Sequence, residues 1–246
     1  MAIRSFFFAL VAAAALVVTA SPALAVAGSP YTSGNSGYDA SSYQCGTTPP
    51  SGSSFAIIRD TGGRPFTTDS CATSLWNAAS TPTNRSVYFN TGYSGAYRQQ
   101  ITSACSTLAS TTGLTGKYQQ AYAIGCSEAA WAVDARPGTP SAWWADVETG
   151  NSWASSDLSL NVATIRGILA RLGQQTGQPS GIYSTRSSWQ TITGGAPLPA
   201  VPNWVVRSDP YTCTSQGGGF SGGPVWLIQN GTNSASGTAY DWDTAC

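Results

Sequence analysis

The sequence predicts an α/β fold, a TIM-like barrel built from five βα units followed by three strands without helices. Eight short aromatic and β-branched segments, bounded mostly by Gly, Pro, Asn or Ser, have the pattern of strands. Helical patterns separate these segments only in the earlier part of the chain. Alternating strands and helices imply parallel strands with crossover helices, and eight such strands close into a barrel. An open doubly wound sheet is the alternative, although it would ordinarily keep helices on both faces.

The N-terminus has the pattern of a secretory signal peptide. One arginine precedes an apolar run that ends in the small residues Ala23 and Ala25. We therefore expect a signal peptide at 1–25, a flexible lead-in at 26–36 and one barrel domain over 37–246. No later stretch has the roughly 18 apolar residues that a membrane span needs. The expected product is a secreted, extracellular monomer with no membrane association after cleavage.

The eight predicted strands share a short apolar and aromatic core that ends at turn-forming residues. Their order along the chain sets the order of the predicted barrel. They are the segments 37–44, 55–59, 86–93, 141–148, 180–184, 203–207, 225–229 and 239–243.

The clearest predicted helix spans 155–177, where Leu158, Val162, Ile165 and Leu169 recur at helical spacing. The connections after the sixth and seventh strands have no helical period, which gives the three bare strands at the end. The other predicted helices are 69–79, 96–109, 117–136 and 185–192.

Composition excludes several classes of function. Charged residues are 9% of the chain and the net charge is zero, so no basic patch is available for nucleic acid or a membrane surface. The chain has no histidine. Ser221, in the segment "GFSGGP", therefore lacks the base that a serine nucleophile needs, and a glycine-rich loop is the better interpretation. Histidine-bearing metal motifs are excluded as well, and we expect neither a metal nor a cofactor.

The cysteine content predicts three disulfides, because paired cysteines are typical of exported chains. Six cysteines allow 15 pairings, and we expect neighbours along the chain to pair, so that the last pair fixes the C-terminus. The cysteines are Cys45, Cys71, Cys105, Cys126, Cys213 and Cys246.

The segment "WWADVETG" holds the most informative carboxyl groups. Asp146 and Glu148, one of only two glutamates, are two positions apart on a predicted strand. Side chains at i and i+2 point to one face, here the barrel interior near its C-terminal mouth. Two carboxylates roughly 6–7 Å apart in apolar surroundings do not both ionise easily, so one becomes a proton donor near neutral pH. Glycoside cleavage needs such a donor and a second carboxylate. A solvated pair at an exposed strand end is the alternative.

The ordered series "YDASSYQ", "FAIIR", "VYFN", "WADVE", "GIYS", "NWVV", "VWLIQ" and "YDWD" resembles the strands of glycoside hydrolase family 25. These are lysozymes, also called Chalaropsis-type muramidases, and the resemblance covers most of the mature chain. It implies a barrel of eight strands and five helices with acidic residues at Asp39, Asp146, Glu148 and Asp241. It further implies that Glu148 is the general acid and that Asp146 orients the 2-acetamido group in a substrate-assisted route.

Two departures mark the chain as a diverged relative. The third strand lacks the histidine that the family often has, and Asp243 stands where the family often has asparagine. The segment 59–71 is longer and more polar than is typical of a muramidase.

Further side chains on predicted strands are candidates for contact with a sugar, by ring stacking or hydrogen bonding. Barrel core is the alternative for the aromatic ones, and a salt bridge to Asp60 is the alternative for the arginine. The candidates are Tyr88, Tyr183, Trp204, Gln229 and Arg59.

These observations predict a secreted glycosidase that cleaves β-1,4 links in an N-acetylated polysaccharide, with peptidoglycan of the cell wall as the expected substrate. The presence of all four acidic residues supports catalysis. The alternative is a non-catalytic carbohydrate-binding or cell-surface protein on the same barrel, which the altered segment 59–71 supports.

Overall fold

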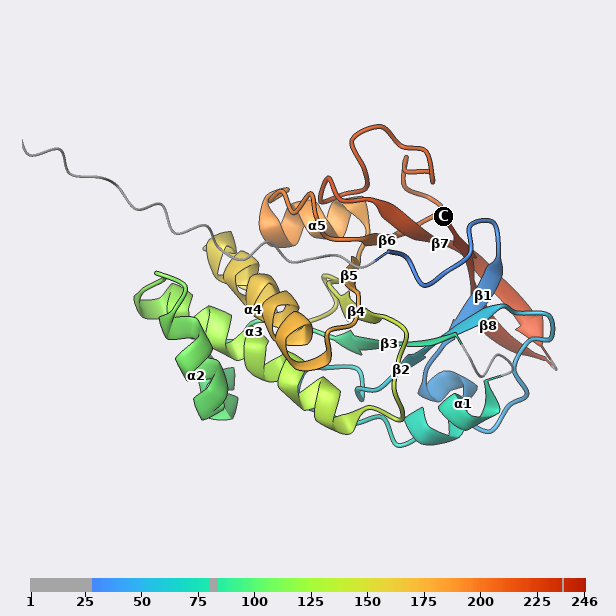
Figure 1. Ribbon diagram of the computed structural model, residues 1–246, viewed down its shortest axis with the longest axis horizontal. Coiled ribbons are helices and arrows are strands. Elements are labelled where there is room, and N and C mark those ends of the chain that lie inside the picture. The colour runs from blue at the N-terminus through green and yellow to red at the C-terminus, as the bar shows by residue number, and fades with distance from the viewer. Residues whose placement is uncertain (1–27, 80–83, 236) are drawn as a thin grey trace, which may run out of the picture.

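The computed structural model describes residues 28–79, 84–235 and 237–246, so the predicted signal peptide at 1–25 lies outside the described residues. Eight strands form one closed barrel in the order of the sequence, which confirms the predicted fold class (Figure 1). The strands are β1 (Ser36–Ala40), β2 (Phe55–Arg59), β3 (Arg85–Asn90), β4 (Trp143–Asp146), β5 (Ser180–Tyr183), β6 (Asn203–Val206), β7 (Val225–Ala235) and β8 (Thr238–Ala245).

Seven neighbouring strands, β1 to β7, run parallel, whereas β8 is antiparallel to both β7 and β1. β8 begins three residues after β7 ends, which is too short for a crossover connection, and the chain therefore reverses. The barrel is thus closed by one reversed strand, which carries its side chains to the mouth from the opposite direction.

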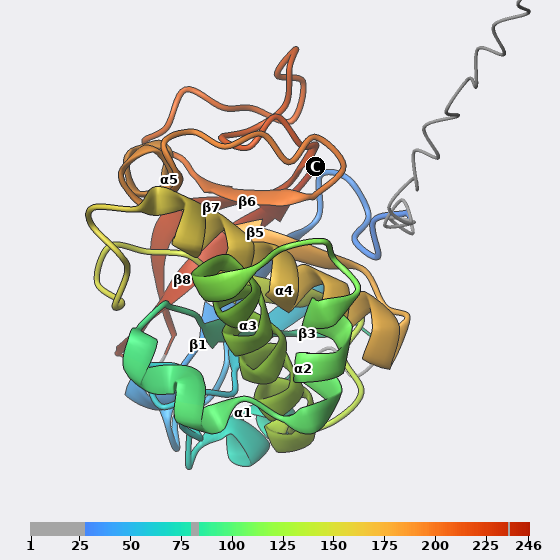
Figure 2. The same cartoon turned by 90° about the vertical axis from the view of Figure 1, so that its left-hand side faces the viewer.

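In the described part of the chain, α-helices follow four strands, β2, β3, β4 and β5, and a 3-10 helix follows β1, so the predicted count of five βα units is not confirmed. α2, α3 and α4 lie together on one side of the barrel, and Figure 2 shows them in front of the strands. In the described part of the chain, no helix has both the length and the apolar character required to cross a membrane. The helices are η1 (Ser42–Gln44), α1 (Ala72–Ala78), η2 (Gly95–Gln100), α2 (Ser103–Ser110), α3 (Gly116–Ala135), α4 (Leu158–Thr176) and α5 (Arg186–Thr193).

Several predicted elements have other bounds in the structure, and the strand predicted over 141–148 ends at Asp146, so Glu148 lies beyond it. In two cases the difference arises because a polar side chain caps a helix. The strand predicted over 37–44 ends at Ala40, since Ser41 begins η1 in a capping box and its N–H donates to Gln44 Oε1 at 2.9 Å. The helix predicted over 96–109 is divided into η2 and α2. The break occurs at Thr102, whose Oγ1 accepts the Cys105 N–H at 3.2 Å and caps α2.

Strand side chains alternate between the barrel interior and an outer layer beneath the helices. The interior contains a cluster of aromatic and aliphatic side chains that includes Phe55, Ile57, Trp144, Trp204 and Leu227. The outer layer includes Tyr38, Ile58, Phe89 and Trp143. Asp39, between Tyr38 and Ala40, therefore faces inward.

Tyr31, from the segment predicted as a flexible lead-in, is buried in the interior cluster. Its hydroxyl lies 2.6 Å from Ser86 Oγ and accepts the Trp144 Nε1–H at 2.9 Å. Burial raises the pKa of the Tyr31 hydroxyl. The barrel interior is thus filled by large side chains below the polar side chains of the mouth.

The three disulfides join Cys45 to Cys71, Cys105 to Cys126 and Cys213 to Cys246, which confirms the predicted pairing of neighbours. The first joins the end of η1 to the start of α1, and the second joins α2 to α3. The third fixes the last residue of the chain to the loop after β6.

α3 and α4 approach closely at two glycines. A Cβ added at Gly167 would collide with the Tyr122 carbonyl oxygen, and one added at Gly125 would collide with that of Thr164. We expect Gly167→Ala to lower the free energy of unfolding by about 3 kcal/mol, because these backbone atoms cannot move without separating the helices. Urea denaturation measures this change. Gly95→Ala is the control, since nothing lies within 4 Å of its Cβ. Equal losses for the two variants would contradict the close helix contact.

Candidate active site

The mouth of the barrel collects the four acidic residues that the sequence predicts. Asp39 and Asp146 lie at the C-terminal ends of β1 and β4, and Asp241 on β8 is the register partner of Asp39. Glu148 lies two residues beyond β4. The charges of Asp39 and Asp241, of Asp39 and Glu148, of Glu148 and Asp241, and of Asp146 and Glu148 interact with one another. The structure therefore brings all four together, while their roles stay predictions.

Asp39 is held by a chain of hydrogen bonds across the barrel. The Tyr183 hydroxyl donates to Gln229 Oε1 at 2.9 Å, which orients the amide so that its Nε2 donates to Asp39 Oδ2 at 2.8 Å. Burial and the charge of Asp241 raise the pKa of Asp39 to about 7. Tyr183 and Gln229, predicted as sugar contacts, thus support Asp39 in the free protein.

Asp243 is a fifth acid of the site and is completely buried. Trp204 Nε1 donates to its Oδ1 at 2.8 Å, and its Oδ2 receives no donor from a described N–H or O–H group. The Asp39 carboxyl lies within hydrogen-bonding reach, with Asp243 as the protonated member. Burial, reinforced by the charge of Asp39, raises the pKa of Asp243 well above its ordinary value. The neutral, protonated form of Asp243 is therefore favoured.

Asp146 is 3% exposed and is oriented by its neighbours on β3. Asn90, its register partner, donates its amide to Asp146 Oδ2. Thr61 Oγ1 in turn donates to Asn90 Oδ1 at 2.9 Å and fixes the direction of that amide. Burial and the charge of Glu148 raise the pKa of Asp146 well above its ordinary value. The remaining oxygen of Asp146, Oδ1, has no N–H donor among the described residues.

Glu148 lies past the end of β4, yet its backbone is fixed. Trp153 Nε1 and the Asn151 N–H both donate to its carbonyl oxygen, at 2.9 and 3.1 Å. Its half-buried side chain lies within hydrogen-bonding reach of Asp146. Burial raises the pKa of Glu148, while the hydrogen bond from Asp146 opposes the rise. The pair therefore combines a buried carboxyl with one that reaches the open mouth, and the raised pKa values of both favour protonated forms.

Asp241 is half-buried, and burial raises its pKa. No described side chain or backbone group forms a hydrogen bond with its carboxyl group. It differs in this respect from Asp39 and Asp146, which are both held by amides. Asp241 therefore remains available to a water molecule or a sugar in the mouth.

Aromatic rings form the floor beneath the acids. Trp204 is 1% exposed and meets Tyr183 at a centroid distance of 4.6 Å and Tyr88 at 6.1 Å. Burial, followed by the charge of Asp39, raises the pKa of the partly exposed Tyr88. Of these three predicted sugar contacts, Tyr88 and Tyr183 reach the surface, whereas Trp204 lies beneath them. A role in binding sugar stays a prediction for each.

Arg59 forms a salt bridge with Asp69 and not with Asp60, the partner that the sequence suggested. Its Nη2 and Nε lie 3.1 and 3.2 Å from Asp69 Oδ2. The pairing with Asp60 is wrong because successive strand residues point to opposite faces, which sends Arg59 inward and Asp60 outward. The positive charge of Arg59 reaches the mouth, where it opposes the raised pKa of Asp146. A direct contact between Arg59 and a sugar stays a prediction.

The raised carboxyl pKa values predict that acid stabilises the fold. A carboxyl with a raised pKa binds its proton more tightly in the folded state than in the unfolded state, so it favours folding at low pH. This stabilising contribution is fully present below about pH 3.9, the pKa of an aspartate in the unfolded chain. It is lost as the pH rises through about 7, the pKa of Asp39 in the folded protein. Asp60 and Glu128, both buried, have pKa values raised by burial and act in the same direction.

We therefore expect the Tm to rise by about 4 °C or more when the pH is lowered from 8 to 5. Differential scanning calorimetry measures the change. Asp39→Asn keeps the shape and removes one titrating group, so its Tm is expected to depend less on pH. A parent Tm that falls between pH 8 and pH 5 would contradict the burial of these acids.

Sequence reasoning missed Asn90 and did not settle Asp243. Asn90 ends β3 as Asp146 ends β4, and this shared position at the strand end was an available signal. The burial of Asp243 depends on the reversed direction of β8, which the sequence pattern does not show.

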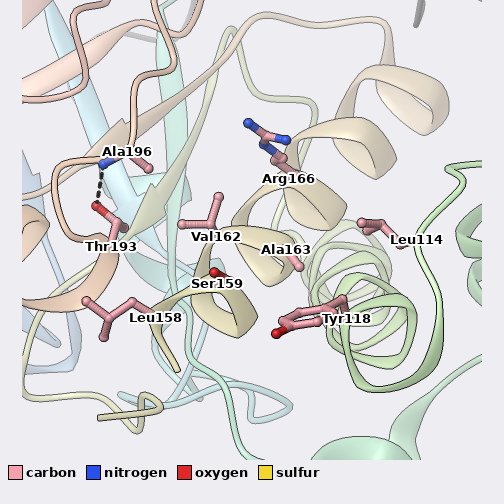
Figure 3. Close-up of a pocket in the computed structure, with 9 residues that line it drawn as sticks. All are labelled: Leu114, Tyr118, Leu158, Ser159, Val162, Ala163, Arg166, Thr193 and Ala196. Atoms are coloured by element: carbon pink, nitrogen blue, oxygen red, sulfur yellow. Dashed lines mark hydrogen bonds between the residues drawn. The ribbon is translucent and has the colours of Figure 1, made fainter. Parts of the chain in front are cut away.

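A cavity of about 520 Å³ is lined by residues of α3, α4 and α5 (Figure 3). Tyr118, Val162 and Arg166 are among its lining residues, and none of the five mouth acids is. Among the described residues, no group of three or more Asp, Glu, Cys or His side chains has the arrangement of a metal site.

No protein-family model and no curated protein sequence matches the chain. Solved structures do match. The bacterial lysozyme from Streptomyces coelicolor has a TM-score of 0.60 at 22% sequence identity, with 87% of this chain and 93% of that chain covered. A muramidase from Acremonium alcalophilum has a TM-score of 0.59 at 18% identity, with 86% and 93% covered.

A family GH25 lysozyme from Aspergillus fumigatus has a TM-score of 0.59 at 17% identity, with 86% of this chain and 93% of that chain covered. The chain thus has the barrel fold of these family 25 enzymes. The resemblance of the strand series is confirmed at the level of the fold.

Proposed function

We propose that the protein is a secreted glycoside hydrolase that cleaves β-1,4 links in the N-acetylated glycan of peptidoglycan. The observation that carries the proposal is the Asp146–Glu148 pair at the mouth of the barrel, where burial raises the pKa of both carboxyls and Glu148 is the partly exposed member. The structural similarity to lysozymes and muramidases supports the same function. The three disulfides and the signal-like N-terminus support secretion.

Glu148 is the proposed general acid. Cleavage of a glycosidic bond requires a proton on the leaving oxygen as the bond to the anomeric carbon breaks. Of the two carboxyls of the pair, only Glu148 is exposed enough to approach a sugar, because Asp146 is 3% exposed. When a substrate fills the mouth, the displacement of water raises the preference of Glu148 for its neutral, protonated form.

Asp146 is the proposed positioning acid of the pair. Asn90 holds one of its oxygens, and the other is buried with no donor among the described N–H and O–H groups. In a substrate-assisted route, the 2-acetamido oxygen of the sugar attacks the anomeric carbon while the leaving oxygen takes the proton from Glu148. Asp146 would accept a hydrogen bond from the acetamido N–H and stabilise the positive charge that develops on that group.

The second group of acids would act on the opposite side of the sugar. Asp241 has no hydrogen bond to a described residue and is the available carboxylate for stabilising charge at the anomeric carbon. Burial raises the pKa values of Asp39 and Asp243, which favours their neutral forms and limits the negative charge near Asp241. Tyr88, on the floor of the mouth, offers its ring and hydroxyl to the sugar.

A comparison of three insoluble polysaccharides tests the proposal. We expect the protein to release soluble fragments with new reducing ends from purified peptidoglycan, and none from cellulose, which lacks acetamido groups. Chitin has acetamido groups but no lactyl groups, so its cleavage or survival shows whether the protein needs the lactyl groups of peptidoglycan. Binding to peptidoglycan without any release of fragments would overturn catalysis and favour a carbohydrate-binding protein.

A further inference from the structure

The connection between β1 and β2 presents a single aromatic side chain to solvent. Tyr43, in η1, is 84% exposed, and Trp131 at 40% is the other strongly exposed large hydrophobic residue in the described part of the chain. One exposed aromatic ring is ordinary on a protein surface. The backbone beneath Tyr43, however, is fixed to an unusual extent for an exposed loop.

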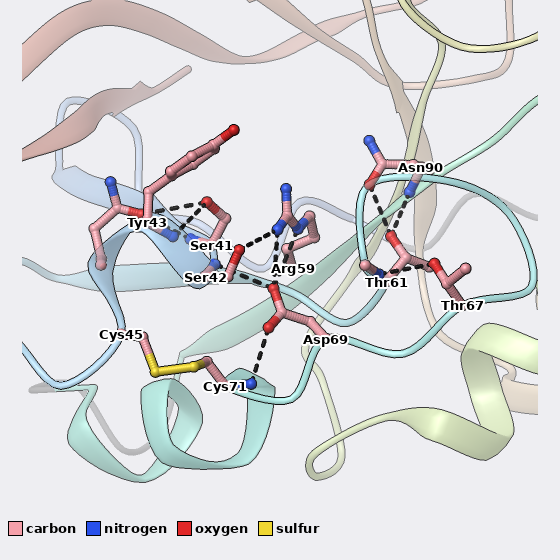
Figure 4. Close-up of polar contacts among 12 residues, drawn as sticks. Ser41, Ser42, Tyr43, Cys45, Arg59, Thr61, Thr67, Asp69, Cys71 and Asn90 are labelled. Atoms are coloured by element: carbon pink, nitrogen blue, oxygen red, sulfur yellow. Dashed lines mark hydrogen bonds and ion pairs between the residues drawn. A yellow bond between two sulfur atoms is a disulfide. The ribbon is translucent and has the colours of Figure 1, made fainter.

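Contacts on both sides of Tyr43 form a rigid base (Figure 4). On one side, Arg59 Nη2 donates to Ser42 Oγ at 2.7 Å and the Ser42 N–H donates to Asp69 Oδ2 at 3.1 Å. On the other side, Gln44 Nε2 donates to the Ala239 carbonyl oxygen of β8 at 2.8 Å. A disulfide then joins the next residue, Cys45, to Cys71. The loop is therefore ordered in advance, although nothing covers the ring that it carries.

The ring stands at the rim of the barrel mouth. In Figure 4, the free ends of Tyr43, Arg59 and Asn90 extend to the same side, away from the disulfide. Asn90 contacts Asp146, and the charge of Arg59 acts on both Asp146 and Tyr88. Arg59 therefore lies between the catalytic pair and the base of Tyr43, which places Tyr43 outside the reacting centre but on the same opening.

We propose that Tyr43 forms an outer subsite, where a pyranose ring of the glycan strand stacks at a distance from the cleaved bond. This inference rests on the proposed function, because it assigns the ring to the same polysaccharide. The C–H face of a sugar is apolar and packs on an aromatic ring, and a tyrosine on a fixed backbone loses little conformational freedom when it binds. The subsite recognises glycan strands that are long enough to extend beyond the barrel mouth.

Binding measurements on a catalytically disabled chain test the subsite. In a Glu148→Gln background, isothermal titration calorimetry would compare peptide-free peptidoglycan glycan fragments of two and eight sugars. We expect Tyr43→Ala to weaken binding of the octasaccharide about fivefold to tenfold and to leave binding of the disaccharide unchanged. Tyr43→Phe keeps the ring and is expected to bind both fragments as the background chain does.

Trp131→Ala is the matched control, since it removes the other exposed aromatic ring and is expected to leave both affinities unchanged. Equal octasaccharide affinity with and without the Tyr43 ring would overturn the subsite. So would an equal loss in the Tyr43 and Trp131 variants, which would indicate general adsorption. Hydrolysis by the parent chain is scored separately. If the parent chain cleaves the glycan but the Tyr43 substitution does not change binding, only the subsite proposal is overturned. If binding depends on Tyr43 but the parent chain does not cleave the glycan, only the proposed hydrolase function is overturned.

Discussion

Glu148→Gln is expected to lower the rate of glycan cleavage by about 10³-fold or more and to leave the fold intact. Glutamine has nearly the shape of glutamate and can keep a hydrogen bond to Asp146, but it has no proton to give to the leaving oxygen. General acid catalysis contributes about 10²- to 10⁴-fold to a rate. The release of reducing ends from purified peptidoglycan measures the loss, and circular dichroism confirms the fold.

Glu128→Gln is the matched control for this substitution. Glu128 is the other glutamate of the chain, lies buried in α3 and accepts the Gly92 N–H at 3.2 Å. Burial raises its pKa, so its neutral form is favoured and glutamine replaces it with little change in charge. We expect the control to keep nearly all activity. Full activity of the Glu148 variant would remove that residue from the reaction.

Asp146→Asn is expected to lower activity at pH 7 by about 10²-fold or more. The asparagine oxygen can still accept the Asn90 amide, which places its own N–H₂ toward Glu148. A permanent donor at that place stabilises the Glu148 carboxylate and lowers its pKa. Glu148 then carries its proton only under more acidic conditions, and no carboxylate remains to hold the acetamido group.

The pH profile of kcat distinguishes this cause from simple damage to the site. We expect the deficit of the Asp146 variant to be larger at pH 7 than at pH 4, because acid restores the proton on Glu148. Asp157→Asn serves as a control, since Asp157 is paired with Lys117 on the surface, at the start of α4. A deficit that is the same at every pH would contradict an effect of Asp146 on the protonation of Glu148.

The barrel could be predicted from the sequence because its signals are local. Each strand is a short aromatic and β-branched run, and α4 shows its apolar face at helical spacing from Leu158 to Leu169. The ends of elements were less predictable, because they depend on single polar contacts. Ser41 ends β1 through a capping box, and Thr102 divides one predicted helix into two.

The acidic residues of the site were predictable from their positions at strand ends, but their partners were not. Asp39 and Asp243 come from opposite ends of the chain and meet only because β8 runs against β1. The pairing of Arg59 with Asp69 depends on the loop after β2, in which the Asp69 N–H donates to the Asp60 carbonyl oxygen at 2.8 Å. Contacts of this kind follow from closure of the barrel and from the paths of its loops, which no local pattern encodes.

A crystal structure of the Glu148→Gln chain with a bound glycan fragment tests the central claim most directly. We expect a sugar across the barrel mouth, with the glycosidic oxygen about 3 Å from the side-chain amide of residue 148 and the acetamido group beside Asp146. A fragment that binds elsewhere on the protein, or that crosses the mouth with its glycosidic oxygens out of reach of residue 148, would contradict it.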